Sequence, residues 1–160
     1  MRSSFSIAAA VALTLLSGLA ANGQTSPQPA AGAPGAADQA GRRANSILLE
    51  LNKLEPAAGG CRAYFVVENR TPEAVRELRL DTFIFDANGQ IARRIGLTFP
   101  DIRPERTKVV PFDLAGAACP EIGRMLVNDV LACTGASGGP LQGCNDLLTV
   151  ATRASARFEY

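Results

Sequence analysis

The chain has 160 residues, with 16 Lys and Arg against 15 Asp and Glu, four Cys, and neither His nor Trp. This near balance of charge excludes the strongly basic footprint of a nucleic-acid-binding domain. Without His, the chain lacks the commonest general base and the commonest metal ligand, so we expect no metal, no cofactor and no enzymatic activity. The length predicts one folded domain after removal of a targeting segment.

Residues 1–21 have the pattern of a cleavable signal peptide. Arg2 gives the N-terminal end of this segment a positive charge. The apolar run at 7–19 is shorter than a bilayer-spanning helix, which needs about 20 residues. Small residues at 18–23 then offer cleavage positions. An uncleaved membrane anchor is the alternative. We expect export to the periplasm and no transmembrane segment in the mature protein.

Residues 22–44 are rich in Gln, Pro, Ala and Gly and contain no large apolar side chain. Such a segment cannot bury enough apolar surface to offset the entropy lost on ordering. We interpret it as a disordered linker, acting either as a passive spacer or as a recognition segment. It leads into a single domain at 45–160.

The domain begins with two segments whose patterns are typical of strands. At 46–54, Ile47, Leu49 and Leu51 alternate onto one face, although helical spacing leaves a helix as the alternative. At 61–68, aromatic and β-branched residues occupy both faces of the segment. A strand that is apolar on both faces belongs in the middle of a sheet, so this segment is predicted to be central.

The segments at 78–85 and 90–98 are predicted to form a hairpin. They flank residues 86–89, whose Asn-Gly step is a strong short-range hairpin signal. Arg93 falls among the apolar positions of the second strand, so we infer a twist or bulge that lets it reach solvent. The residues expected to face the core from this strand are Ile91, Ile95 and Leu97.

The remaining elements complete an all-β domain. A loop is predicted at 99–106, a strand at 107–114, a strand at 124–133, a Gly-rich loop at 134–143 and a strand at 147–158. Pro111 removes a backbone donor, which places its strand at an edge or a bulge. Strands at this spacing predict a single immunoglobulin-like antiparallel β-sandwich of about seven strands.

The four cysteines are predicted to form two disulfides, because an exported protein meets an oxidising compartment. Cys133 and Cys144 bound the Gly-rich loop and would close it. If the strands at 61–68 and 107–114 are antiparallel neighbours, Cys61 at the start of one faces Cys119 just past the end of the other. A regulatory thiol pair and a metal site are the alternatives; neither the CxxC spacing nor closely spaced ligands are present.

Two groups of polar residues are candidates for function. The first is a positive surface that could bind an acidic partner or a lipid headgroup, formed by Arg93, Arg94, Arg103, Arg106 and Lys108. A solvated face that discourages edge aggregation is its alternative. The second is a buried polar network, formed by Asn69, Asn128 and Asp129. A ligand-binding cleft near Asn128 and Asp129 is the alternative for that group.

The segments at 47–55, 61–69, 85–89 and 122–133 give the domain a family resemblance. It resembles the small exported alphaproteobacterial proteins that are labelled as containing a Tat-pathway signal. The middle of the domain is also similar to immunoglobulin-like modules. The sequence Arg2-Ser3-Ser4 lacks the twin arginine, so ordinary Sec export is expected. The resemblance implies no activity, but it does imply a link to proton-channel biopolymer-transport systems as partners.

The sequence therefore predicts a non-enzymatic periplasmic accessory or interaction module of a cell-envelope assembly, with an envelope protein as partner. The alternative is a periplasmic module that binds a small ligand or lipid. The Asp residues are scattered among strand ends and turns, where Asp is common for local reasons, so no catalytic pair is expected.

Overall fold

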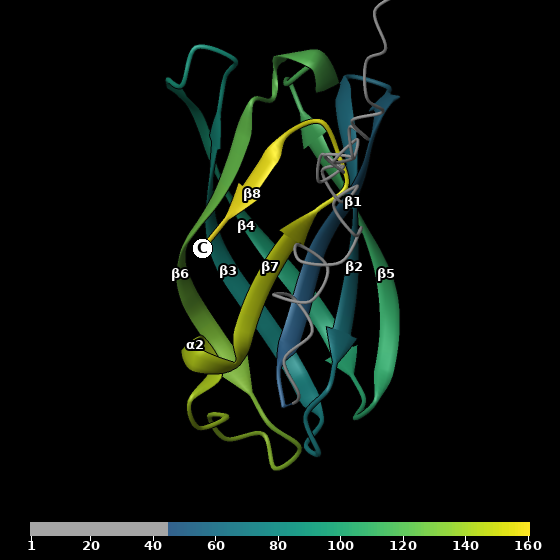
Figure 1. Cartoon of the computed structure of the whole chain (residues 1–160), viewed down its shortest axis with the longest axis vertical. Coiled ribbons are helices and arrows are strands. Elements are labelled where there is room, and N and C mark those ends of the chain that lie inside the picture. The colour runs from purple at the N-terminus through teal and green to yellow at the C-terminus, as the bar shows by residue number, and fades with distance from the viewer. Residues whose placement is uncertain (1–44) are drawn as a thin grey trace, which may run out of the picture. The chain divides into compact units, whose positions relative to one another are not determined.

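The computed structural model describes residues 45–160 of the chain (Figure 1). The predicted signal peptide at 1–21 and the predicted linker at 22–44 lie outside the described residues. Within residues 45–160, no helix is long enough and apolar enough to cross a membrane.

Eight strands and two short helical turns make up this part of the chain. The strands are β1 (Ile47–Ala57), β2 (Gly60–Asn69), β3 (Val75–Phe85), β4 (Ile91–Ile102), β5 (Arg106–Ala115), β6 (Arg124–Thr134), β7 (Leu148–Thr152) and β8 (Arg157–Glu159). A 3-10 helix, η1 (Cys119–Glu121), precedes β6, and one α-helical turn, α2 (Cys144–Leu147), precedes β7.

The strands form two four-stranded sheets. The first sheet has the order β5-β2-β1-β7 and the second has the order β4-β3-β6-β8. β1 pairs with β7 in parallel and β6 pairs with β8 in parallel, whereas the other neighbours are antiparallel. The predicted immunoglobulin-like all-β sandwich is confirmed, with eight strands and two parallel pairs that the sequence pattern did not indicate.

Alternation of side chains explains the two central strands of the first sheet. Ile47, Leu49 and Leu51 are buried, which confirms the strand at the start of the domain over the helical alternative. In β2, every second residue from Cys61 to Asn69 is buried, and the strand lies between β1 and β5 as predicted.

The predicted hairpin and the predicted edge strand are confirmed. β3 and β4 pair across the turn at 86–89, where Asp86 Oδ1 accepts hydrogen bonds from the backbone N–H groups of Asn88 and Gln90, each 2.9 Å long. β5 lies at the edge of the first sheet and pairs only with β2 there. Pro111 is tolerated because an edge strand can lack one outward donor.

β4 departs from the prediction at both ends. It continues through the expected loop at 99–106 as far as Ile102, because Phe99 and Ile102 are buried and Pro100 is tolerated on an edge strand. Ile91, expected in the core, is 62% exposed. The pairing with β3 skips Ala92, and this bulge reverses which face the residues before it occupy.

The segment predicted as one strand at 147–158 is divided between the two sheets. It starts inside α2, continues as β7 in the first sheet, and then crosses to β8 in the second. The Thr152 hydroxyl donates to the Ala156 carbonyl over 2.9 Å and stabilises the turn between the two strands. Figure 1 shows β8 running beside β6 and ending part of the way along it.

Aromatic rings join the two sheets. The ring of Phe65 on β2 meets Phe99 and Phe112 with centroids 5.7 Å apart, and meets Phe158 at 5.4 Å, all in edge-to-face geometry. Phe99 and Phe158 belong to the second sheet, so Phe65 contacts both of its outer strands. Edge-to-face pairs add to the stability that burial of the rings provides.

Both predicted disulfides are present. Cys61 bonds to Cys119 and Cys133 bonds to Cys144, leaving no free cysteine in the described part of the chain. The antiparallel pairing of β2 with β5 places Cys61 opposite Leu114, close to the turn that carries Cys119. Two disulfides fit a protein that folds in an oxidising compartment.

Candidate functional site

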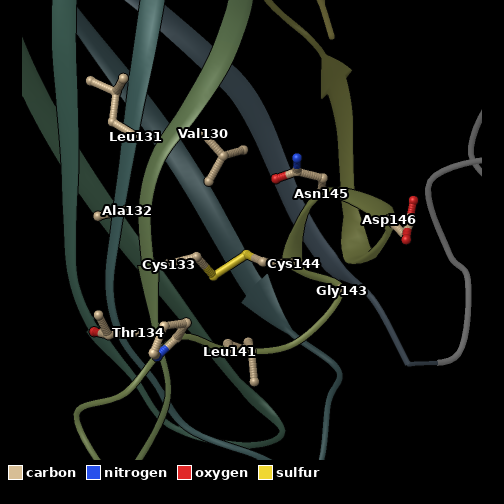
Figure 2. Close-up of a pocket in the computed structure, with 11 residues that line it drawn as sticks. Val130, Leu131, Ala132, Cys133, Thr134, Leu141, Gly143, Cys144, Asn145 and Asp146 are labelled. Atoms are coloured by element: carbon tan, nitrogen blue, oxygen red, sulfur yellow. A yellow bond between two sulfur atoms is a disulfide. The ribbon is translucent and has the colours of Figure 1, made fainter.

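A hollow of about 640 Å³ opens where β6 ends and the chain returns to β7 (Figure 2). We call it the β6–α2 hollow. Its lining comes from the last part of β6, from the Gly-rich loop and from α2. The Cys133–Cys144 disulfide connects the two sides of the hollow and fixes α2 against β6.

The hollow has apolar walls and a polar rim. Figure 2 shows Val130 and Cys133 pointing from β6 toward α2, with Leu131 on the other side of the strand. Val130, Cys133 and Leu141 are half-buried and pack against the core. Asn145 and Asp146 on α2 are exposed. A ligand here would meet apolar contacts inside and polar groups at the entrance.

The edge of β6 beside this hollow has no strand partner among the described residues. β8 pairs only with the stretch from Arg124 to Leu126, and the next bridge on that side joins Thr134 to Pro140. Pairing with β3 on the other side skips Asn128 and Leu131, so two bulges interrupt β6. The Val130 N–H donates to Asp129 Oδ1 over 2.8 Å, so this backbone donor is already satisfied.

Two acidic residues lie close to the hollow, and Figure 2 shows the Asp146 carboxylate on the side of α2 away from β6. Asp146 is one of the lining residues, and Asp129 directly precedes Val130 on β6. Neither carboxylate forms an ion pair with a described residue. Burial raises the pKa of Tyr160, and the charges of Asp129 and Asp146 raise it further. The Tyr160 hydroxyl therefore lies within the field of both carboxylates.

The five basic residues predicted to share a surface lie in two separate places. Arg103, Arg106 and Lys108 line a hollow of about 310 Å³ at the β4–β5 turn. The Asp101 side chain partly balances them, with its Oδ2 4.0 Å from Arg103 Nε, and Lys108 Nζ donates to the Asp101 carbonyl over 3.2 Å. Arg103 and Arg106 are exposed and Lys108 is half-buried, so this group could contact an acidic partner.

Arg93 and Arg94 lie toward the other end of β4, roughly 30 Å along the extended strand from the β4–β5 turn. Arg93 donates to the Ala115 carbonyl. Arg94 forms a two-bond ion pair with Asp81. These two side chains are therefore engaged in joining strands, and the expected continuous positive surface is not formed.

The predicted buried network is also divided. Asn69 is fully buried and makes four hydrogen bonds, with Thr71, Glu73 and Ile102 as partners. Asn128 and Asp129 are exposed instead, because the bulge at Asn128 turns this part of β6 outward. Asn128 Nδ2 donates to Asp81 Oδ2 over 3.0 Å. The prediction of one buried network is wrong, and its members have separate structural roles.

Several other acidic side chains in the described part, among them Asp81, Asp101 and Asp113, form ion pairs with arginines. Arg62 holds Asp113 with two bonds, of 2.6 and 3.1 Å, and lowers the pKa of that carboxyl. A third hollow, of about 410 Å³, lies between the turn at 86–89 and η1, with Arg93 and Glu121 among its lining. Within residues 45–160, no group of three or more His, Cys, Asp or Glu side chains could hold a metal ion.

The sequence predicted a cleft near Asn128 and Asp129 only as an alternative. The observed hollow begins at the next residue, Val130, and the sequence did not predict that the Gly-rich loop would line it. The usable signal was the pair of cysteines around that loop, which brings β6 and α2 together. Comparison of the chain with protein-family models, curated proteins and solved structures found no match.

Proposed function

We propose that this domain is a non-enzymatic periplasmic accessory module that binds an envelope protein, and that the β6–α2 hollow is its contact surface. The proposal rests mainly on the open side of the sandwich, where the edge of β6 that faces β8 has no strand partner from Val127 to Ala132 among the described residues. Backbone edges without a partner are common contact points between chains.

The state of the acidic residues supports a binding role over a catalytic one. Asp81 and Asp113 have lowered pKa values because arginines hold them, and neither lies at the β6–α2 hollow. A general acid or base is more effective with a pKa near the working pH. The two carboxylates beside the hollow, Asp129 and Asp146, are better suited to attracting a positively charged partner.

Export agrees with this proposal. The signal-peptide pattern at 1–21 would direct the domain to the periplasm, where it would meet envelope proteins. The family resemblance adds biopolymer-transport systems as a class of partner. The two disulfides suit such a compartment.

A small-ligand or lipid-binding module is the second candidate, favoured by the size of the hollow. Its volume of about 640 Å³ lies in the range of small-molecule sites, about 300–1,000 Å³. Such sites usually enclose most of their ligand, whereas Asn145, Asp146 and Gly143 leave this one exposed at its rim. The interaction module is therefore preferred.

In-cell chemical crosslinking of a tagged full-length chain, followed by mass spectrometry, distinguishes the interaction module from the ligand-binding module. The proposal predicts one reproducible envelope protein whose crosslinked peptides map to β6, the Gly-rich loop or α2. A clean monomer, with a lipid or metabolite co-purifying, would reject it in favour of the second candidate.

A further inference from the structure

The hollow of about 410 Å³ between the turn at 86–89 and η1 is a second surface of the domain. We call it the η1 hollow. It lies at the end of the sandwich where β6 begins, whereas the β6–α2 hollow lies where β6 ends. An inference about the η1 hollow therefore goes beyond the proposed contact with an envelope protein and does not depend on it.

Arg93 lines the η1 hollow from a position of β4 that faces the interior of the sandwich. It pairs with the buried Ile84, and Leu97 and Phe99, which share its alternation along the strand, are buried as well. The bulge of β4 lies before Arg93 and leaves its side chain on this interior face, where it is half-buried. A charged side chain in such a place needs partners for its donors.

The Arg93 guanidinium has few partners within residues 45–160. It donates to the Ala115 carbonyl of the opposite sheet and forms no ion pair in that part of the chain. It also lies against Gly116, where a Cβ would come within 2.8 Å of Arg93 Nη2. Since a guanidinium has five N–H donors, most of those of Arg93 remain for an acceptor in the hollow.

Two carboxylates line the same hollow without pairing with Arg93. Asp86 Oδ1 accepts the two backbone bonds of the turn at 86–89, and Glu121 Oε2 accepts from the Ala118 N–H over 3.3 Å. These bonds keep each carboxylate beside its own turn. Asp86 Oδ2 and Glu121 Oε1 have no hydrogen-bond partner among the described residues. The η1 hollow therefore presents both signs of charge.

A small zwitterion matches this arrangement of charges. A carboxylate can accept two parallel bonds from a guanidinium, and an ammonium group can donate three bonds to carboxylate oxygens. A simple anion would be repelled by Asp86 and Glu121, and a simple cation would be repelled by Arg93. A ligand that carries both charged groups pairs with both kinds of side chain.

The remaining walls of the η1 hollow are apolar. Ile84, Ala87, Ala117 and Ile122 are among its lining, and Ile84 and Ile122 are buried. The volume of about 410 Å³ lies in the range of small-molecule sites, about 300–1,000 Å³. Apolar walls with a few polar groups are typical of such sites, so an aliphatic side chain suits the uncharged part of the ligand.

We propose that the η1 hollow binds a free α-amino acid with an aliphatic side chain, whose carboxylate pairs with Arg93 and whose ammonium group pairs with Glu121. Asp86 adds attraction for the ammonium group, and the aliphatic side chain packs against Ala117 and Ile122. The domain thus carries a small-ligand site apart from its contact surface.

Titration of the full chain, with both disulfides intact, by L-leucine and two analogues tests this proposal. Isocaproate is leucine without the ammonium group, and L-leucinamide lacks the carboxylate, while both keep the aliphatic side chain. In two-dimensional amide NMR, L-leucine is expected to cause saturable shifts at Ala87, Arg93, Ala117 and Ile122. Each analogue is expected to bind at least about fivefold more weakly, because it leaves a charged group of the hollow unpaired.

Arg93→Gln and Arg106→Gln form a matched pair of variants, since each removes one cation. Arg93→Gln keeps a side-chain donor near the Ala115 carbonyl and is expected to weaken L-leucine binding about tenfold. Arg106 is exposed at the other end of β5 from Ala115, so its variant should leave binding unchanged. The amide spectrum of each variant shows directly whether it is folded.

Glu121→Gln distinguishes a ligand contact from a structural role. It keeps an acceptor for the Ala118 N–H but removes the charge that faces the ammonium group. L-leucine should bind to this variant about fivefold more weakly, whereas isocaproate should bind no more weakly than before. This comparison tests the proposal even if Arg93→Gln does not fold.

Several outcomes would overturn the amino-acid site. These are equal binding of L-leucine and either analogue, absence of saturable shifts at millimolar L-leucine, and equal effects of the Arg93 and Arg106 variants. Stronger binding of isocaproate would show a plain anion site and would also contradict the proposal. Crosslinks at the β6–α2 hollow test the envelope partner separately, so either proposal can fail while the other stands.

Discussion

Asp81 and Arg94 form an ion pair across β3 and β4 in which the acid is buried and the base is exposed. Arg94 Nε lies 2.6 Å from Asp81 Oδ1 and its Nη2 lies 3.2 Å from Oδ2, while the Asp81 side chain is only 5% exposed. Arg62 and Asp113 form a pair of nearly the same geometry, but the Asp113 side chain is 64% exposed. The two pairs therefore differ mainly in burial.

This contrast predicts the relative cost of neutralising each acid. Asp81→Asn should lower the urea midpoint of unfolding roughly twice as much as Asp113→Asn, because exposed pairs are screened by water and contribute little. The Asn side chain would also keep only one acceptor oxygen, where Asp81 uses both of its oxygens to accept from Arg94 and Asn128. Equilibrium unfolding followed by far-ultraviolet circular dichroism gives both midpoints. Equal shifts would show that the burial of Asp81 has no energetic consequence.

The lowered pKa values of Asp81 and Asp113 predict how stability depends on pH. Each pKa is lowered first by a side-chain hydrogen bond from an arginine, so the folded protein binds fewer protons than the unfolded one at acidic pH. The stabilisation is complete above the unfolded pKa of about 3.9 and is lost as the pH falls through the folded pKa. Stability should thus decline in acid, and less steeply in Asp81→Asn.

Without His, no side chain of ordinary pKa titrates between pH 5 and 8. The free energy of unfolding is therefore expected to be nearly flat across that interval, apart from the chain's amino terminus. Urea unfolding at a series of pH values tests the plateau and the acid decline together. A steep change near neutral pH would contradict this expectation.

Asn69 is predicted to be the most important polar residue for stability. Its side chain is fully buried and bonds to Thr71, Glu73 and Ile102, which connects the end of β2 with the segment before β3 and the end of β4. Asn69→Ala should cost about 3 kcal/mol, because buried partners are left without hydrogen bonds. The control Asn52→Ala, at an exposed position, should change stability by less than about 0.5 kcal/mol. Similar losses in both variants would contradict the assigned role.

The two disulfides are expected to differ in both energy and accessibility. Cys61 and Cys119 are 58 residues apart and buried, so replacing both with Ala should cost about 4 kcal/mol. Cys133 and Cys144 are 11 residues apart, which predicts about 2.7 kcal/mol for their replacement.

The Cys133–Cys144 disulfide lines the β6–α2 hollow, so a mild thiol reductant should reduce it before the buried Cys61–Cys119 disulfide. Mass spectrometry of alkylated peptides follows this order. Earlier labelling of Cys61 and Cys119 would contradict the prediction.

Local patterns were sufficient to predict most of the sandwich. Alternation predicted β1 and β2, the Asn-Gly step predicted the β3–β4 hairpin, and the expected pairing of β2 with β5 led to the Cys61–Cys119 bond. These features depend on residues close in sequence, or on one strand neighbour. Their agreement with one another is what made the fold predictable.

The errors share a different cause. The bulge at Ala92 exposes Ile91, and the bulge at Asn128 exposes a residue expected in a buried network. A bulge inserts one residue and inverts the faces before or after it, without a distinctive sequence pattern. The crossing from β7 to β8 was missed because a short turn between apolar residues is hard to distinguish from a continuous strand. The β6–α2 hollow is lined by Leu131, at the second bulge of β6, and by the loop that the Cys133–Cys144 disulfide closes.

The most direct test of the proposed interaction module is site-specific photo-crosslinking in cells. A photo-reactive amino acid replaces Asn145 at the β6–α2 hollow or, as the matched control, Val109 on the β5 edge, whose side chain is 58% exposed. The proposed function predicts that one envelope protein is captured from position 145 and that capture from position 109 is much weaker. Equal capture from both positions, or none from position 145, would contradict it.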